Sequence, residues 1–227
     1  MKDKSLSLAG VLFDFDGVVV DSFQSHFTAW NNAHFELFSS KIETFPHAQL
    51  AGKSPYIIAE YFANEAGDIH KSQELFQLKG SYLHKSATSP KLLPGVLEIQ
   101  GFLAEKNIAH GIASNATHQF VQNSVTQLDL GFTTLFGLED YTHPKPHPEA
   151  YLTLAKALHI SSKDFGNTWV FEDSITGTKA AVAAGMVPIG ILTMNTEAEM
   201  LKAGSHLCFP TLLEAYQYLS TKDIQKR

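Results

Sequence analysis

Short apolar runs alternate with stretches of helical periodicity over most of the 227-residue chain. The apolar runs predict strands at residues 11–13, 108–113, 135–138, 168–171, 187–191 and 207–209, and the periodic stretches predict helices at 96–106, 119–128, 148–158 and 174–184. Strands that alternate with helices form a parallel sheet with helices on both faces and right-handed crossovers. The predicted fold class is therefore α/β, with a doubly wound and mostly parallel sheet.

Residues 18–91 break this alternation, because their pattern stays helical and contains no convincing strand. A helix is predicted after an N-cap at Asp21 or Ser22, and two more are predicted at 55–66 and 72–84. We expect an inserted α-helical domain, with boundaries of 1–17 and 92–227 for the α/β core and 18–91 for the insertion, and with crossings near 17–22 and 89–95.

Asp14 and Asp16 stand where the first predicted strand of the core should end. Two carboxylates after a buried strand are costly unless a cation holds them. Side chains two apart in a strand point to the same side, and ligands bind over the carboxyl ends of parallel strands. Gly17 then lets the backbone turn sharply. The alternative is an Asp-Gly hairpin turn, which leaves Asp14 unexplained.

Three further segments carry polar residues at places that suit the same site. Residues 112–115 are an apolar strand that ends in a hydroxyl residue, 143–148 contain a Lys-Pro pair before a helix, and 169–174 are a strand that ends in two acids. With residues 14–22 they resemble, in order, the four motifs of the haloacid dehalogenase superfamily of phosphohydrolases and phosphomutases. The resemblance covers nearly the whole chain. It implies a Rossmann-like core and makes the insertion a C1 helical cap.

The resemblance also implies catalytic roles. Asp14 would be the nucleophile that forms an aspartyl-phosphate, and Asp16 would be the general acid and base. Ser114, Asn115 and neighbouring backbone N–H groups would bind the phosphoryl oxygens, and Lys145 would bind substrate and neutralise charge.

A metal site is expected from the same acids. Asp14, Asp16, Glu172 and Asp173 would place four carboxylates in one crevice, where they repel each other at low dielectric. Mg²⁺ resolves this repulsion, because it accepts a few carboxylates together with waters and a substrate phosphate. By resemblance, Asp14 and Asp173 supply carboxylates, Asp16 its backbone carbonyl, and Glu172 orients a ligand or a water.

In the insertion, His26 and Trp30 lie one helical turn apart. This resembles the β-phosphoglucomutase-like branch, where a histidine at the matching place approaches the acid/base. The alternative is that His26 only packs beside Trp30 and Phe23. Lys53 is expected to contact substrate, and Lys79 is a second candidate in the cap.

Arginine is nearly absent, since 16 of the 17 basic residues are lysines and Arg227 is the only arginine. Mutases of the resembling branch hold a second phosphate with an arginine shortly after a glycine of the cap. Here the stretch from Gly52 to Tyr56 contains none, and lysine grips phosphate with weaker geometric control. The departure favours hydrolysis over phosphate transfer.

Composition adds limits on location and partners. The net charge of -6 argues against nucleic acid as a partner. No apolar stretch approaches the roughly 20 residues of a membrane span, so a cytoplasmic protein without a membrane partner is expected. Cys208 is the only cysteine, so an internal disulfide is impossible. Oligomeric state cannot be predicted from these patterns.

The leading hypothesis is a Mg²⁺-dependent phosphatase acting on a small phosphorylated metabolite, such as a sugar phosphate or a phosphoglycolate-like acid. The alternatives are a β-phosphoglucomutase-like phosphotransferase and, in another class, a catalytically silent binding protein, although the complete set of motif residues argues against silence. Dehalogenation would leave Asp16 and Asp173 without a role, and phosphonate cleavage does not use the second aspartate. Finally, His143 and His147 are flanked by prolines and are not expected to share a helix face as metal ligands.

Overall fold

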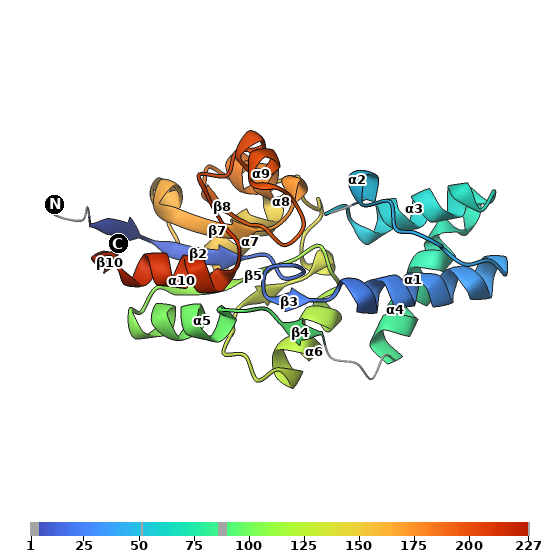
Figure 1. Ribbon diagram of the computed structural model, residues 1–227, viewed down its shortest axis with the longest axis horizontal. Coiled ribbons are helices and arrows are strands. Elements are labelled where there is room, and N and C mark those ends of the chain that lie inside the picture. The colour runs from blue at the N-terminus through green and yellow to red at the C-terminus, as the bar shows by residue number, and fades with distance from the viewer. Residues whose placement is uncertain (1–4, 51, 86–89, 227) are drawn as a thin grey trace.

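The computed structural model describes residues 5–50, 52–85 and 90–226, and its centre is a six-stranded sheet (Figure 1). The strand order is β6-β5-β2-β7-β8-β9, and each neighbouring pair is parallel. The strands are β2 (Gly10–Phe13), β5 (Ala109–Ala113), β6 (Leu135–Phe136), β7 (Thr168–Glu172), β8 (Val187–Ile191) and β9 (Leu207–Phe209). This arrangement confirms the predicted α/β class.

Side chains of the central strands alternate between two apolar cores, one on each face of the sheet. In β2, Val11 and Phe13 enter one core and Leu12 the other. In β7, Phe171 and Val170 divide in the same way, and all five side chains are fully buried. Each contributes about 1.5–3 kcal/mol by leaving water. Because alternate side chains must enter opposite cores, a shift by one residue would expose the wrong set, and this fixes the register of the strands that carry the site.

Helices cover both faces of the sheet. The first core packs under α5 (Val96–Glu105), α6 (His118–Gln127) and α10 (Leu212–Ser220), and the second under α7 (Glu149–Ala157) and α8 (Ile175–Ala183), with α9 (Glu197–Ala203) beside α8. Short 3-10 turns occur at η1 (Ile69–Lys71), η2 (Leu138–Asp140) and η3 (Ser162–Asn167). The predicted strand at 135–138 stops at Phe136, shortly before η2 begins.

Helices α1 (Phe23–Phe38), α2 (His47–Leu50), α3 (Pro55–Glu65) and α4 (Ser72–Lys85) form a separate group beyond the sheet (Figure 1). They enclose an apolar cluster of their own, which includes Trp30, Phe62 and Leu75. A helix N-cap at Asp21 or Ser22 was expected. Ser22 does precede α1, but its side chain does not cap the helix, because its hydroxyl donates to the Asp16 carboxylate instead.

The chain enters and leaves the helical group through two short strands that were not predicted. Strand β3 (Val20–Asp21) pairs antiparallel with β4 (Lys91–Leu92). We propose domain boundaries of 17/18 and 91/92, because the first lies shortly before β3 and the second falls within β4. Residue 89, the start of the second expected crossing, lies outside the described residues. A further unpredicted pair joins β1 (Leu6–Leu8) in parallel to β10 (Ile224–Lys226), at the end of the molecule away from the cap (Figure 1).

Candidate active site

A cavity of about 670 Å³ lies where the carboxyl ends of the central strands face the cap helices. Asp14 follows β2, Ser114 follows β5 and Asp173 follows β7, and all three line it. His26 and Lys79 line it from the cap. The volume suits a small organic ligand. Parallel strands and an inserted helical group thus bring residues from distant parts of the sequence to one place.

Asp14 is held at the floor of this cavity. Its backbone N–H donates to the carbonyl of Phe171 at 2.9 Å, and its Oδ1 lies 2.6 Å from Lys145 Nζ. Burial raises the pKa of the Asp14 carboxyl to about 7, and the charges of Glu172 and Asp16 act in the same direction, although Lys145 opposes them. A single lysine therefore does not balance the negative charge gathered around Asp14.

Lys145 is buried and makes three contacts. Its Nζ lies 2.6 Å from Asp14 Oδ1 and 2.8 Å from both Glu172 Oε1 and the Tyr151 hydroxyl. The two carboxylates hold the pKa of Lys145 above its usual value despite burial. Tyr151, which also donates to Glu172, was not anticipated from the sequence, because an aromatic on a buried helix face gives the signal of a core residue.

Glu172 is fully buried and both of its oxygens accept hydrogen bonds. Oε1 accepts from Lys145 and Tyr151, while Oε2 accepts from the Ser174 hydroxyl at 3.0 Å and its N–H at 3.3 Å. A Cβ on Gly177 would come within 1.7 Å of the same carboxylate. Glu172 is thereby fixed against Lys145.

Asn115 anchors the loop that presents Lys145. Its Oδ1 accepts from the Lys145 N–H and the Tyr141 hydroxyl, each at 3.1 Å, and its Nδ2 lies 3.4 Å from the Lys145 carbonyl. The expected contact of Asn115 with substrate stays a prediction. Ser114 Oγ accepts from the Ala116 N–H at 3.0 Å, and Ser114 faces the cavity as expected.

Asp14, Glu172 and Asp173 each offer an oxygen, and these oxygens lie within 4.8 Å of one another. Burial raises the pKa of Asp173 well above its usual value, and the neighbouring acids raise it further. A Cβ on Gly17, where φ is +81°, would lie 1.8 Å from Asp173 Oδ2, so this turn requires glycine. Buried, mutually repelling oxygen donors are the set that a hard divalent cation prefers.

His26 and Lys79 of the cap form a hydrogen-bonded chain to Asp16. Lys79 Nζ lies 2.8 Å from His26 Nδ1, and His26 Nε2 lies 3.2 Å from Asp16 Oδ1. A charged ammonium can only donate, so Nδ1 accepts and Nε2–H donates to Asp16. Burial and then Lys79 lower the pKa of His26, which favours this neutral form. Burial lowers the pKa of Lys79 to about 8.

These cap residues lower the pKa of Asp16, the acid/base candidate. Burial alone would raise the pKa of Asp16, but His26, Ser22 and Lys79 outweigh it and hold that pKa below its usual value. His26 therefore contacts Asp16 as the resemblance implied, rather than only packing in the apolar cluster. Lys79, a secondary candidate in the sequence, is buried beside the ring of Trp30 and lines the same cavity.

Lys53 lies at the rim of the cavity and is exposed. The glycine before it approaches the core closely. The Gly52 carbonyl lies 3.5 Å from Asn115 Nδ2, and a Cβ on Gly52 would come within 2.8 Å of the Ser174 side chain. The cap loop thus touches the core beside the cavity, and the expected contact of Lys53 with substrate stays a prediction.

Residues 11–191 match the family model described as haloacid dehalogenase-like hydrolase. The chain belongs to this family. It is 28% identical over 205 residues to the phosphorylated carbohydrates phosphatase of Thermotoga maritima, covering 87% of this chain and 92% of that protein. It is also 28% identical over 193 residues to the β-phosphoglucomutase of Bacillus subtilis, covering 81% of this chain and 83% of the relative.

Solved structures agree on the fold. The crystal structure of a β-phosphoglucomutase from Clostridium difficile superposes with a TM-score of 0.77 at 22% identity, covering 95% of this chain and 97% of that one. The resemblance inferred from the four motifs, the fold class and the enzyme class of hydrolase are confirmed. Among the described residues, no helix combines the length and apolar character that crossing a membrane requires.

Proposed function

We propose that this hydrolase is a Mg²⁺-dependent phosphatase that acts on a small phosphorylated metabolite through an aspartyl-phosphate on Asp14. The named relatives act on phosphorylated carbohydrates or phosphoglucose, which supports a phosphate ester as substrate. The observation that carries the proposal is the placement of Asp14, which faces the cavity with Lys145 2.6 Å from one oxygen. A carboxylate held in this way can attack an electrophile that enters from the cavity.

The donor set around Asp14 fits Mg²⁺. Asp14 and Asp173 would hold the ion with their carboxylates, and Asp16 with its backbone carbonyl. Glu172 would contribute negative charge while it positions Lys145, because both of its oxygens already accept hydrogen bonds. When bound, Mg²⁺ supplies charge neutralisation that brings an anionic phosphate close to the acids.

The residues would then divide the work between attack and departure. Asp14 attacks phosphorus, while Asp16 protonates the departing oxygen and later removes a proton from the attacking water. Lys145 and Ser114 stabilise the charge on the phosphoryl oxygens. His26 and Lys79 orient Asp16 through the chain of hydrogen bonds described above.

Two observations favour hydrolysis over phosphate transfer. Lys79, one of the two cap cations considered for a second phosphate, is already engaged by His26, and Lys53 is exposed at the rim. Arg227 is the only arginine of the chain and lies outside the described residues. A phosphotransferase remains the alternative, which the mutase relative supports. A silent binding protein would not need the ionic contact between Asp14 and Lys145.

The experiment measures phosphate release from a panel of phosphorylated metabolites, with Mg²⁺, with Ca²⁺ and with a chelator. We expect turnover with Mg²⁺ alone, since Ca²⁺ takes more ligands and disturbs the geometry of attack. Asp14→Asn should abolish turnover, while Asp223→Asn, at an exposed site, should not change it. Activity that persists in the chelator, or in Asp14→Asn, would overturn the proposal.

A second assay separates hydrolysis from transfer. The enzyme is incubated with β-glucose 1-phosphate and a trace of the 1,6-bisphosphate, and both products are measured. The proposal expects inorganic phosphate to accumulate from monophosphates without need of the bisphosphate. Glucose 6-phosphate that accumulates much faster than inorganic phosphate would establish the phosphotransferase instead.

A further inference from the structure

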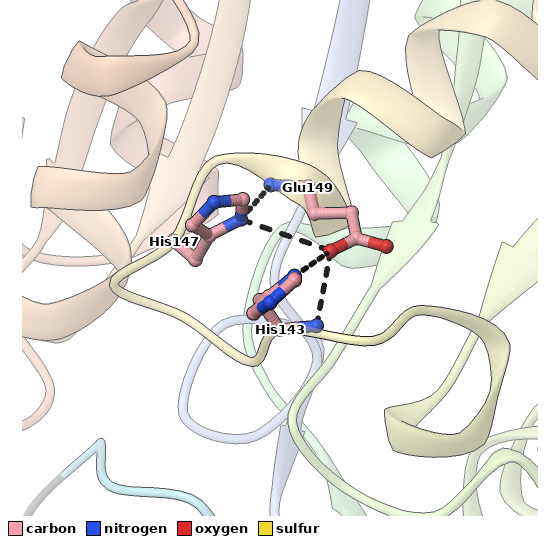
Figure 2. A group of neighbouring side chains, drawn as sticks. All are labelled: His143, His147 and Glu149. Atoms are coloured by element: carbon pink, nitrogen blue, oxygen red, sulfur yellow. Dashed lines mark hydrogen bonds and ion pairs between the residues drawn. The ribbon is translucent and has the colours of Figure 1, made fainter.

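A second group of potential ligands lies on the outer side of the loop that carries Lys145. Figure 2 shows His143, His147 and Glu149 turned toward one another. Glu149 Oε2 lies 2.7 Å from His143 Nδ1 and 3.8 Å from His147 Nδ1, and the two imidazole rings are 4.6 Å apart. One ligand atom from each of the three residues lies within 4.8 Å of the others.

The loop, rather than a helix, brings these side chains together. The two histidines do not share a helix face, as expected from the prolines, because Glu149 is the first residue of α7. Prolines at 144, 146 and 148 nevertheless restrict the backbone between them. The Glu149 carboxylate accepts from the N–H groups of Thr142 at 2.9 Å and His143 at 3.0 Å. These bonds hold the Glu149 carboxylate beside His143 before any ligand arrives, whereas His147 Nδ1 accepts from the Glu149 N–H at 3.3 Å and must leave that bond to take an ion.

We propose that His143, His147 and Glu149 bind a first-row transition-metal ion, best represented by Zn²⁺, at a site separate from the acidic site of Asp14. Two imidazoles and one carboxylate are a donor set that Zn²⁺ accepts, with water in the remaining position. Bond lengths of about 2.0–2.1 Å around a tetrahedral ion place neighbouring ligand atoms about 3.3 Å apart. The distances from Glu149 Oε2, 2.7 Å to His143 Nδ1 and 3.8 Å to His147 Nδ1, lie on either side of that value.

The nitrogen donors distinguish this site from the site of Asp14. Mg²⁺ prefers oxygen ligands, whereas imidazole suits Zn²⁺, Ni²⁺ and Cu²⁺. His143 must present an unprotonated Nδ1, so the proton that now lies toward Glu149 moves to Nε2 or to solvent. The side chains of His143 and His147 are 62% and 51% exposed, which leaves an open path for the ion and for water.

The position of the site within the loop gives the ion a specific effect. Lys145 lies between the two histidines in sequence, but its side chain is directed into the core, toward Asp14 and Glu172. An ion that joins His143 to His147 would therefore tie together both ends of the segment that presents Lys145. Because the three ligands come together only in the folded protein, the ion should bind that state more tightly and raise the melting temperature.

The test uses the full chain without a histidine tag, in excess Mg²⁺ to fill the acidic site. Zn²⁺ binding is measured by calorimetry, and Co²⁺ binding by the visible absorption that tetrahedral nitrogen and oxygen ligands produce. We expect one equivalent of Zn²⁺, and a Co²⁺ spectrum that Zn²⁺ removes. Even the loss of an outer-shell partner costs about 10–100-fold in affinity, so His143→Gln/His147→Gln should lose at least about 100-fold.

The matched control is His118→Gln. His118 Nδ1 lies 2.5 Å from Asp140, so it is an exposed histidine paired with an acid, but outside the proposed site. This variant should bind Zn²⁺ and gain melting temperature as the unsubstituted protein does. Equal Zn²⁺ affinity in the double variant, or no Zn²⁺ bound by the unsubstituted protein in excess Mg²⁺, would overturn the proposal. Should the double variant fold poorly, His147→Ala alone provides the same comparison.

Discussion

Asp14 should make the metal-free protein less stable as the pH rises. Its pKa is raised from 3.8 to about 7 in the folded protein, mainly by burial. Between these values the folded chain binds more protons than the unfolded chain, so the free energy of unfolding falls with increasing pH. The contribution of Asp14 to the free energy of unfolding is fully present below its pKa in the unfolded chain. It is lost as the pH rises through its pKa in the folded protein. The total loss is about 4 kcal/mol.

The assay is urea unfolding in a chelator at several pH values. About 3 kcal/mol of the loss should fall between pH about 5 and about 8. Asp14→Asn should flatten most of the profile, because it removes the titration of Asp14 and also the charge that raises the pKa of Asp173, whereas the exposed control Asp223→Asn should leave it unchanged. Asp173 shifts in the same direction, so some slope should remain in Asp14→Asn. Parallel profiles for Asp14→Asn and the unsubstituted protein would refute the reasoning.

The same measurement tests the metal assignment. A cation among these carboxylates favours their charged forms and lowers their pKa values. Saturating Mg²⁺ should therefore remove most of the pH dependence from the unsubstituted protein, and should change Asp14→Asn much less. An equal effect of Mg²⁺ on both proteins would place the ion elsewhere.

Three further outcomes are expected. Lys145→Met leaves two buried carboxylates without their cation and should cost about 3–5 kcal/mol in urea unfolding; a cost below about 1 kcal/mol would contradict the buried pairing. Gly177→Ala should displace the Glu172 carboxylate and cost about 1–3 kcal/mol, whereas Gly101→Ala, where the added methyl meets open space within a helix, should gain up to about 1 kcal/mol. Lys79→Met should lower kcat about tenfold or more for alkyl phosphates and less for aryl phosphates. Equal losses of kcat for the two substrate classes would show that Lys79 does not act through Asp16.

The sheet and most helices could be predicted because their signals are local. The strand at Val187–Ile191 has the predicted bounds, since a buried parallel strand is a continuous apolar run between turns. Helices α9 and α10 were missed although each begins with a capping box, Thr196 with Glu199 and Thr211 with Glu214. The pairs β1–β10 and β3–β4 join segments far apart in the sequence, and runs of two or three residues give no periodic signal.

The site was predicted residue by residue only where a motif marks it. The motifs gave Asp14, Lys145 and Asp173, which line one cavity in the structure. The role of Tyr151 depends on how α7 packs on the sheet beside Lys145 and Glu172, and the role of Lys79 depends on how the cap sits over the core. Periodicity shows that a face is buried, but it does not show what the face contacts.

The paired strands β3 and β4 link the cap to the chemistry. Because Val20–Asp21 and Lys91–Leu92 are hydrogen-bonded to each other, the helical group is attached through one short ladder rather than two independent linkers. His26 and Lys79 lie beyond that ladder, whereas Asp16 lies before it. Any rotation of the cap about the ladder would therefore separate Asp16 from the groups that hold its proton affinity low. The strength of the acid and the enclosure of the substrate would change together.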